Sequence, residues 1–311
     1  MNKYTDVFGH CEQLEFLKNS FKKKFHHSWL IFGNRGIGKK KAIKNFIYWS
    51  LAEKKRTKNS DIFSKHFRRD YINSVKEINC EEENKADMSL IRGIIEDIQL
   101  SNFDSKNFSY LLIDNFDSLN VNVKNALLKT IEEPPEKLII FLIVHNIFNV
   151  PKTISSRCIN LKFEELTKKD FESFLKMENI KYDSDMLNFF YTYSNGNPRL
   201  FLQIYESNGI EIINRTKSII SRDYLEHLKI KEITDLFIGK PDLVLSIVKS
   251  FFYYETINLL KKEYKNLRLY KNILEFLNLI TIKHNENLNL SIKQELTEIF
   301  VNYFSKIKLS K

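Results

Sequence analysis

The chain has 311 residues, of which 43% are hydrophobic and 28% are charged. This composition is typical of a globular protein with two or three compact units rather than of a disordered or membrane protein. Lys and Arg outnumber Asp and Glu by 49 to 39, a net charge of +10 at pH 7. The excess fits work beside a polyanion such as nucleic acid, and it fits solvated, lysine-rich helix faces equally well.

The cysteines and the apolar runs exclude further classes of protein. Cys11, Cys80 and Cys158 are far apart in the sequence, so we expect neither a disulfide framework nor a zinc knuckle and predict no metal site. No apolar run approaches 18 residues, and the first six residues contain no secretory core. We therefore expect no membrane span and a cytoplasmic location.

The first predicted elements are a strand, a loop and a helix. Residues 29–32 form a short apolar run that stops at Gly33, which predicts a strand followed by a glycine-punctuated loop. Apolar and small side chains then recur at helical spacing, which predicts a helix with one buried face. The residues of this face are Ala42, Ile43, Phe46, Ile47, Ser50 and Leu51.

Three further apolar runs predict strands. Residues 110–113 end in Asp114, residues 138–144 are continuously apolar, and residues 159–163 follow a Ser/Arg turn. A continuous apolar run of strand length is typical of a strand that is covered on both faces. Strands that alternate with helices through this half of the chain predict an α/β domain, a parallel sheet flanked by helices.

A helix is expected between the first and second of these runs. Asn120 can cap its first turn, and Pro134 and Pro135 end it because neither can continue the helical hydrogen bonds. The predicted apolar face of this helix consists of Val123, Leu127, Leu128 and Ile131.

Strand signals largely vanish beyond residue 164. Residues 171–177 and 185–193 have helical patterns, Gly196-Asn197-Pro198 marks a turn, and the chain from about residue 210 has mostly helical spacing. One example of this spacing is Leu274, Leu277 and Thr281. We predict an α/β domain at 1–163, a small helical domain at 164–208 and an all-helical C-terminal domain at 209–311.

The loop after the first predicted strand fits the P-loop pattern G-x-x-x-x-G-K. Gly33, Gly36 and Gly38 allow backbone amides to turn toward a phosphate, which Lys39 can reach, and the following helix points its positive end at the same anion. The alternative is a glycine turn with an exposed lysine.

Asp114, at the end of an apolar strand, matches the Walker B position that holds a metal ion, although such an aspartate is often a cap or turn residue.

Two blocks of sequence carry a specific resemblance. The segment 125–136, NALLKTIEEPPE, and the segment 153–158, TISSRC, resemble the AAA+ proteins of the bacterial sliding-clamp loader. Residues 8–10 and 26–30 match the start of the same family. The resemblance is strong over residues 7–163 and weaker at 196–199 and 288–294. It implies a P-loop AAA+ domain, a small helical lid and a C-terminal oligomerisation domain called the collar.

Three departures from the family pattern indicate which type of subunit this is. Lys40 stands where the P-loop hydroxyl normally binds Mg²⁺. Asn115 stands where active members have the glutamate that polarises the attacking water, and an amide cannot accept that proton. The family's four-cysteine zinc module is absent. The lost hydroxyl and glutamate fit the ATPase-deficient delta prime type rather than the ATPase motor type.

The resemblance also implies roles for single residues. Arg157, in the family's Ser-Arg-Cys motif, would act as an arginine finger in the nucleotide site of a neighbouring subunit. The alternative is a surface arginine that caps a helix or pairs with a carboxylate. Arg199 matches the sensor arginine of the lid. His145 and Asn146 follow a strand where the family places a polar residue that senses the γ-phosphate. Cys158 is expected to be a small buried neighbour.

The resemblance therefore implies a non-catalytic subunit of the clamp loader of DNA polymerase III, with no activity alone. Its partners would be the ATPase motor subunits and the delta subunit in a heteropentamer, and through them the sliding clamp and primed DNA. No cofactor is required, and weak binding of ATP or ADP without hydrolysis is left open. The alternatives are an active clamp-loader ATPase and a stand-alone AAA+ recombination or repair protein.

Overall fold

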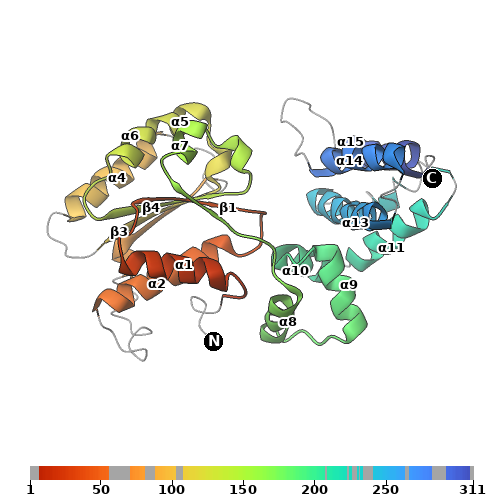
Figure 1. The fold of residues 1–311 in the computed structure, drawn as a ribbon, viewed down its shortest axis with the longest axis horizontal. Helices are drawn as coiled ribbons and strands as arrows, with labels where there is room; N and C mark the ends of the chain where they lie inside the picture. Colours follow the sequence, from red (N-terminus) through yellow and green to blue (C-terminus); the bar gives the residue numbers. More distant parts are fainter. Residues whose placement is uncertain are drawn as a thin grey trace. The chain divides into compact units, whose positions relative to one another are not determined.

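The computed structural model describes residues 7–55, 71–80, 88–102, 108–206, 209–222, 224–225, 230, 232–233, 241–262, 266–281 and 292–308. These residues fall into two compact units, Met1–Ser173 and Phe174–Lys311 (Figure 1). The first six residues and most of the segment 288–294, both used in the sequence analysis, lie outside the described residues.

The first unit contains a five-stranded parallel sheet in the order β2-β3-β4-β1-β5. The strands are β1 (Ser28–Phe32), β2 (Val75–Asn79), β3 (Ser109–Asp114), β4 (Leu138–Val144) and β5 (Ile159–Lys162). Four of them confirm the strands that were predicted from apolar runs. The edge strand β2 was not predicted, because its sequence VKEIN buries just one side chain, Ile78, and has no apolar run.

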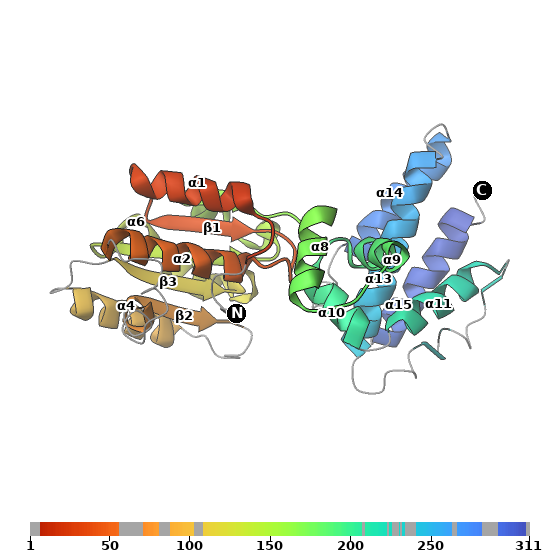
Figure 2. The same ribbon diagram turned by 90° about the horizontal axis from the view of Figure 1, so that it is seen from below.

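Helices cover both faces of this sheet (Figures 1 and 2). On one face lie α1 (Cys11–Lys22) and α2 (Lys39–Lys55). On the other lie α4 (Met88–Asn102), α5 (Val121–Ala126), α6 (Leu128–Glu132) and α7 (Lys152–Ser155). Two short turns follow the carboxyl ends of β3 and β4, namely η2 (Phe116–Ser118) and η3 (Ile147–Asn149). The predicted α/β fold class is confirmed.

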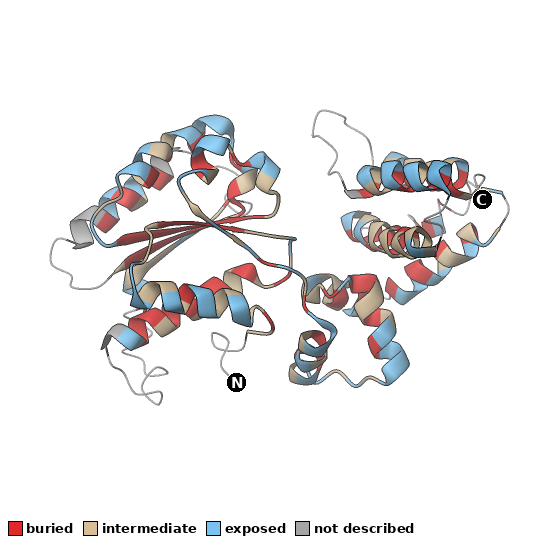
Figure 3. Cartoon of the chain, viewed as in Figure 1, coloured by how far each residue is buried: buried red, intermediate tan, exposed pale blue. Residues whose placement is uncertain are grey.

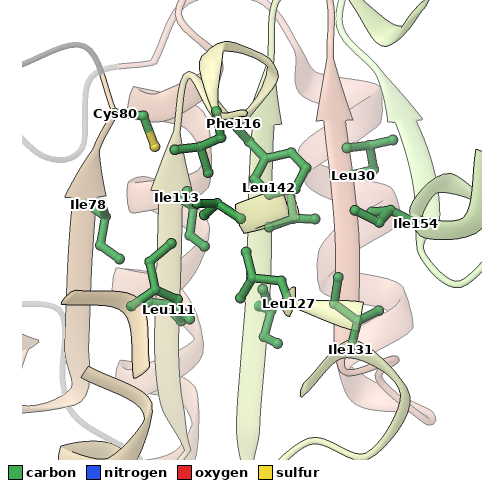
Figure 4. Close-up of a cluster of buried hydrophobic side chains, with 14 of the residues drawn as sticks. Leu30, Ile78, Cys80, Leu111, Ile113, Phe116, Leu127, Ile131, Leu142 and Ile154 are labelled. Atoms are coloured by element: carbon green, nitrogen blue, oxygen red, sulfur yellow. The ribbon is translucent and has the colours of Figure 1, made fainter. Parts of the chain in front are cut away.

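The two faces of the sheet form two separate apolar cores because side chains alternate along each strand. On β3 and β4, Leu111, Ile113 and Leu142 point toward α5, α6 and α7 and meet Leu127 and Ile131 (Figure 4). The intervening residues belong to the cluster beneath α1 and α2, which also contains the predicted apolar side chains of α2. Burial on both faces explains why β4 is apolar at every position (Figure 3).

The helix predicted after Asn120 is present as two short helices. The Oδ1 of Asn120 accepts a hydrogen bond from the backbone N–H of Val123 at 2.9 Å, which confirms the predicted N-cap. The helix is interrupted at Leu127, whose N–H lies 3.3 Å from the carbonyls of both Val123 and Lys124. Of the predicted apolar face, Leu128 is partly rather than fully buried.

The second unit contains helices and no strand among its described residues. Its helices are α9 (Ser184–Ser194), α10 (Pro198–Glu206), α11 (Gly209–Ile220), α13 (Pro241–Lys262), α14 (Leu267–Thr281), α15 (Ile292–Asn302) and the π-turn η4 (Tyr303–Ile307), and α8 (Lys168–Met177) precedes them. The predicted turn separates α9 from α10, where Asn195 and Gly196 have φ angles of 50° and 66°. These helices confirm the expectation for this half of the chain.

The predicted lid and collar share one apolar core. Tyr193, on α9, stacks on Phe251 of α13 with ring centroids 5.7 Å apart. Farther along, Phe252 contacts the rings of Phe276 and Phe300. The boundary at residue 208 therefore separates segments that pack together, and the division into three domains stays a prediction.

The helix indicated by the spacing of Leu274, Leu277 and Thr281 is present as α14, and its buried side is set by other residues. The buried residues are Leu269, Ile273, Phe276 and Ile280, whereas Leu274 is 42% exposed. Apolar residues occur at helical spacing on both sides of this helix, so periodicity alone could not identify the side that packs inward. Leu267, Tyr270 and Leu274 are left on the outer side.

The segment Asp242–Lys261 of α13 is, among the described residues, the one stretch long and apolar enough to cross a membrane by length and composition. The expectation from apolar runs did not anticipate it. Its side chains Val248, Phe251 and Phe252 are fully buried, and the helix is packed on its neighbours in the second unit. These contacts are typical of the central helix of a helical domain.

Candidate functional site

The candidate site lies at the carboxyl edge of the parallel sheet. The loop 33–38 follows β1, and Asn79 ends β2. Asp114 ends β3, and His145 directly follows β4. Because all strands run in the same direction (Figure 2), these residues come together at one edge, where open α/β sheets bind ligands.

The conformation of the loop 33–38 requires its glycines. Gly33, Gly36 and Gly38 have φ angles of 146°, 90° and 102°, a region that other L-residues rarely adopt. At Gly33 there is also no room, because a Cβ would lie 2.2 Å from the carbonyl oxygen of Phe163. The backbone can therefore turn tightly between β1 and α2, as the P-loop pattern predicted.

Lys39 is buried within this loop, with 3% of its surface exposed. Its Nζ donates hydrogen bonds to the carbonyl oxygens of Gly33 at 2.6 Å and Asn34 at 2.7 Å, and to Nδ1 of His145 at 2.9 Å. Burial lowers the pKa of Lys39 to about 8, against the opposing charges of Asp114 and Asp117. The alternative of an exposed lysine on a glycine turn is excluded.

A chain of hydrogen bonds extends from Lys39 across the strand ends. His145 Nδ1 accepts from the ammonium, so its Nε2 carries the proton and donates to Oδ1 of Asn115 at 2.5 Å. The Nδ2 of Asn115 then donates to Oδ1 of Asn79 at 2.8 Å. Burial, followed by the charge of Lys39, lowers the pKa of His145 to about 4, so the imidazole is neutral at pH 7.

Lys40 forms ion pairs with a carboxylate on β2 and with the carboxylate at the end of β3. Its Nζ pairs with Glu77 and lies 3.2 Å from Oδ2 of Asp114. Lys44, one helical turn later, lies 2.5 Å from the other oxygen of Glu77. Burial lowers the pKa of Lys40, but the hydrogen bond to Glu77 and the charge of Asp114 outweigh it, so the net pKa is raised.

These residues do not fit a Mg²⁺ ion. A P-loop site holds the ion with a hydroxyl and a Walker B carboxylate. Here the hydroxyl is replaced by the ammonium of Lys40, and that ammonium is already paired with Asp114. A divalent cation would meet a like charge in place of a ligand.

Sequence reasoning missed two polar residues of this site, Glu77 and Asn79. Both are on β2, and they are brought to the site because Asn79 is in register with Asp114. The local sequence Lys-Glu-Ile-Asn contains a single apolar residue, Ile78, before the polar strand end. That signal is too weak to identify either side chain, and the pairing of β2 with β3 is what positions them.

A buried lysine, also missed, supports the loop that carries His145. Lys124 is 4% exposed, and its Nζ donates to the backbone carbonyls of Asp117 at 2.8 Å and Asn149 at 2.9 Å. The carboxylate of Asp117 in turn accepts hydrogen bonds from the backbone N–H groups of His145 and Asn146. The turns η2 and η3 are thereby tied together.

Arg157 lies away from this edge. It precedes β5, whose first residue, Ile159, is in register with Trp29 near the start of β1, whereas the loop 33–38 follows the end of β1. The side chain is 42% exposed; its Nε lies 2.5 Å from Oε1 of Glu132, and its Nη1 donates to the carbonyl of Thr153 at 2.8 Å. The carboxylate partner of the alternative interpretation is therefore present, and the arginine-finger role of Arg157 stays a prediction.

The two remaining predicted residues have simple surroundings. Cys158 is partly buried beside the apolar core, and burial raises its pKa to about 12, which makes it an unreactive thiol. Arg199 is exposed in the first turn of α10, in the second unit, and its backbone N–H is capped by Oδ1 of Asn197 at 3.1 Å. The sensor role of Arg199 stays a prediction.

Comparisons with known proteins identify what this arrangement resembles. Residues 9–167 match the family model described as "DNA polymerase III, delta subunit". DNA polymerase III subunit gamma of Buchnera aphidicola subsp. Schizaphis graminum is 31% identical over 235 residues, which cover 70% of this chain and 62% of that protein. The chain thus spans less than two thirds of that relative.

Two other proteins are similar over different lengths. DNA polymerase III subunit delta' of the same Buchnera subspecies is 30% identical over 167 residues, covering 51% of this chain and 49% of that protein. A solved structure, a DNA polymerase III gamma subunit-related protein from Thermotoga maritima, aligns over 94% of this chain and 99% of its own. It is 17% identical with a TM-score of 0.45, and agreement at that level adds no argument about function.

Proposed function

The chain belongs to the AAA+ clamp-loader family of DNA polymerase III, and from this premise we propose that it is a non-catalytic subunit of the delta prime type. In this role it assembles with ATPase subunits and presents Arg157 to the nucleotide site of one of them. It acts in the cytoplasm, as part of the replication machinery.

The observation that carries the proposal is the pairing of Lys40 with Asp114 and Glu77. Phosphoryl transfer in P-loop proteins depends on a metal ion that bridges the phosphates and neutralises developing charge. With an ammonium beside the Walker B carboxylate, a metal ion at that place is repelled. Lys40 balances the negative charges of Asp114 and Glu77, and the proposed consequence is that the site does not hydrolyse ATP.

The replacement of the catalytic glutamate supports the same conclusion. Asn115 cannot accept a proton from the attacking water. Its Oδ1 is already the acceptor for His145, and its Nδ2 is bound to Asn79. The amide is therefore held in a hydrogen-bonded chain, and the position of the catalytic glutamate carries no base.

The contacts of Lys39 bear on nucleotide binding. A phosphate group would have to replace the carbonyls of Gly33 and Asn34 and the imidazole of His145 as partners of the ammonium. Because the ammonium of Lys39 is already hydrogen bonded to these three groups, a phosphate must compete with them for it. This competition supports weak binding of ATP or ADP at most. No cofactor is needed for the proposed role.

The position of Arg157 supports a role in trans. It lies at the opposite end of β5 from this chain's own P-loop side, and it is accessible to another subunit. The proposed complex is a heteropentamer that contains ATPase motor subunits and a delta subunit. Through that complex the chain contributes to opening the sliding clamp and placing it on primed DNA.

The helical second unit is the proposed site of assembly. Phe251, Phe252 and Phe276 fill the core of the chain itself, where each is fully buried, so contacts with partners must come from other residues. The exposed apolar residues Tyr270 and Leu274 on α14 are better placed for this purpose.

A second candidate, an active motor subunit of the gamma type, is favoured by one observation. The Buchnera relative named gamma matches 70% of this chain, more than the 51% matched by the relative named delta'. ATP turnover by the purified chain with Mg²⁺ separates the two candidates. We expect no turnover above background, and turnover that is lost in Lys39→Ala would overturn the proposal in favour of the motor type.

A further inference from the structure

Glu132 and Arg157 meet across two elements that are separate in the sequence. Glu132 is the last residue of α6, and Arg157 follows the end of α7. Nε of the arginine lies 2.5 Å from Oε1 of the glutamate, a short contact between opposite charges. The pair joins the Glu-Glu-Pro-Pro segment to the Ser-Arg-Cys segment, the two blocks that were singled out in the sequence.

The backbone that carries Glu132 is fixed. Glu133 donates its N–H to the carbonyl of Lys129 at 2.9 Å, and Pro134 then ends the helix. The carbonyl of Ile131 is hydrogen bonded to Nε2 of His27 at 2.9 Å, and the Ile131 side chain is buried. The side chain of Glu132 therefore extends from a backbone position that these hydrogen bonds hold in place.

The pair contributes little to the stability of the fold. The two side chains are 42% and 45% exposed, so water competes for both charges. A contact of this kind has more effect on where the arginine points than on whether the domain folds. An unrestrained arginine would lose considerable rotamer freedom on docking against a phosphate, and that loss would oppose docking.

The geometry leaves the guanidinium able to bind a second group. Its contacts with Glu132 and with the carbonyl of Thr153 use two of its five N–H donors. The remaining donors can face an anion while the first two hold the plane of the group. Such an arrangement restrains an arginine without neutralising its capacity to donate hydrogen bonds.

We infer that Glu132 is a positioning residue for Arg157, which it holds in the orientation that reaches the phosphates of a nucleotide on the adjacent subunit. This inference rests on the proposed function. It assigns the carboxylate at the end of α6 a task in the reaction of the neighbouring ATPase site, although Glu132 itself touches no nucleotide.

The test uses the complete clamp loader assembled with wild-type or variant chain. The variants are Glu132→Ala, Glu132→Gln, Arg157→Ala and the double variant Glu132→Ala/Arg157→Ala. Glu133→Ala is the matched control, because it removes the same charge from the adjacent position, where no ion pair is formed among the described residues. Circular dichroism and gel filtration check that each variant folds and assembles, and kcat and KM for ATP are measured.

We expect Glu132→Ala to lower the kcat of the loader by part or all of the loss that Arg157→Ala produces, with KM little changed. Glu132→Gln retains an oxygen acceptor and should recover part of the loss, whereas Glu133→Ala should behave as wild type. The double variant should be no slower than Arg157→Ala alone, because a positioning residue has nothing to act on once the arginine is gone.

Three outcomes would overturn the inference. If Arg157→Ala slows the loader and Glu132→Ala does not, the positioning role fails while the proposed function stands. If Glu132→Ala speeds turnover, Glu132 restrains the arginine rather than orienting it productively. If Arg157→Ala itself leaves kcat unchanged, the proposed arginine finger fails, and the role of Glu132 fails with it.

Discussion

Nζ of Lys40 lies 3.2 Å from Oδ2 of Asp114, and the same ammonium also pairs with Glu77. The chain thus supplies its own cation at the end of β3. A hydroxyl at the position of Lys40 would leave Asp114 without this partner and available to a metal ion. One side chain therefore explains both the charge balance of the site and the expected absence of hydrolysis.

Lys40→Thr should create a dependence of nucleotide binding on Mg²⁺. The threonine restores a hydroxyl ligand and removes the ammonium from Asp114, so Mg²⁺ should tighten ADP binding by about tenfold or more, or about 1.4 kcal/mol. Calorimetric titration with ADP in MgCl₂ and in EDTA measures the difference. Lys44→Thr is the control, since Lys44 pairs with Glu77 and has no ion pair with Asp114 among the described contacts.

Wild-type protein should show no such tightening by Mg²⁺. If Mg²⁺ strengthens ADP binding to the wild type as much as to Lys40→Thr, the ammonium does not exclude the ion. The variant should still fail to hydrolyse ATP, because Asn115 remains in place of a base.

His145 should make the protein less stable in mild acid. Its pKa in the folded state is lowered to about 4, mainly by burial and then by Lys39, from an ordinary value of 6.5. The unfolded chain therefore binds the proton first, and stability present above pH 6.5 is lost as the pH falls toward 4. The loss attributable to this residue is at most about 3 kcal/mol.

Denaturant unfolding of wild type and His145→Gln between pH 7 and pH 4.5 tests this expectation. Glutamine can retain a hydrogen bond but does not titrate, so the fall in unfolding free energy should be shallower in the variant. Parallel pH profiles for the two proteins would show that His145 is not the group responsible.

Gly33→Ala should destabilise the first unit by about 2 kcal/mol or more. The new Cβ would lie 2.2 Å from the carbonyl oxygen of Phe163, and the φ angle of 146° is strained for alanine. Gly93→Ala in α4 is the matched control, because a Cβ there meets nothing within 4 Å.

The control should be neutral or stabilising by up to about 1 kcal/mol, since alanine favours a helix over glycine. Thermal unfolding of both variants provides the comparison. Equal stability of Gly33→Ala and Gly93→Ala would mean that the turn between β1 and α2 relaxes at no cost.

Leu274→Glu should weaken entry into the complex without unfolding the chain. Leu274 is 42% exposed on α14, so a charge there disturbs a partner rather than the core. Met186→Glu, at a residue that is 38% exposed on α9, introduces the same charge elsewhere on the unit. Affinity for the other subunits, measured by surface plasmon resonance, should fall in the first variant and not in the second.

A point variant tests assembly better than removal of everything after residue 208. Such a deletion would strip Phe251 from the ring of Tyr193 and expose the core of α9. Undiminished assembly of Leu274→Glu would place the contact on another surface of the chain.

Arg157→Ala should slow ATP hydrolysis by the assembled loader, although on the proposed function this chain hydrolyses no ATP itself. An arginine finger is worth roughly 10³–10⁵ in rate at the site that it serves. Only one of several sites would lose its finger, so total turnover should fall by a fraction, and clamp loading, which requires all sites, should fall further. Arg157→Lys should rescue little because lysine lacks the bidentate geometry.

Steady-state ATP turnover and a clamp-loading assay provide the two measurements. Because Arg157 is 42% exposed, the folded chain and its assembly should be unaffected. Wild-type rates in both assays would make Arg157 a structural residue of the α7 turn.

The sequence by itself determined the elements that depend on local patterns. The apolar runs of β1 and β4 predict strands because a buried parallel strand is covered on both faces, and Asn120 predicts the start of α5 because its side chain can cap the next backbone amides. The sequence also identifies Lys40 and Asn115 as substitutions in the two motifs. Lys40 has a fixed spacing from Gly33 in the P-loop pattern, and Asn115 directly follows Asp114 of the Walker B pattern.

Tertiary structure alone decided which distant residues meet. Glu77 and Asn79 reach the site because β2 pairs with β3, and β2 itself has no apolar run to reveal it. Glu132 meets Arg157 because α6 and α7 pack on the same face of the sheet. Local periodicity records how one segment hydrogen bonds and which side is apolar, whereas pairing depends on register and packing between segments that are far apart in the chain.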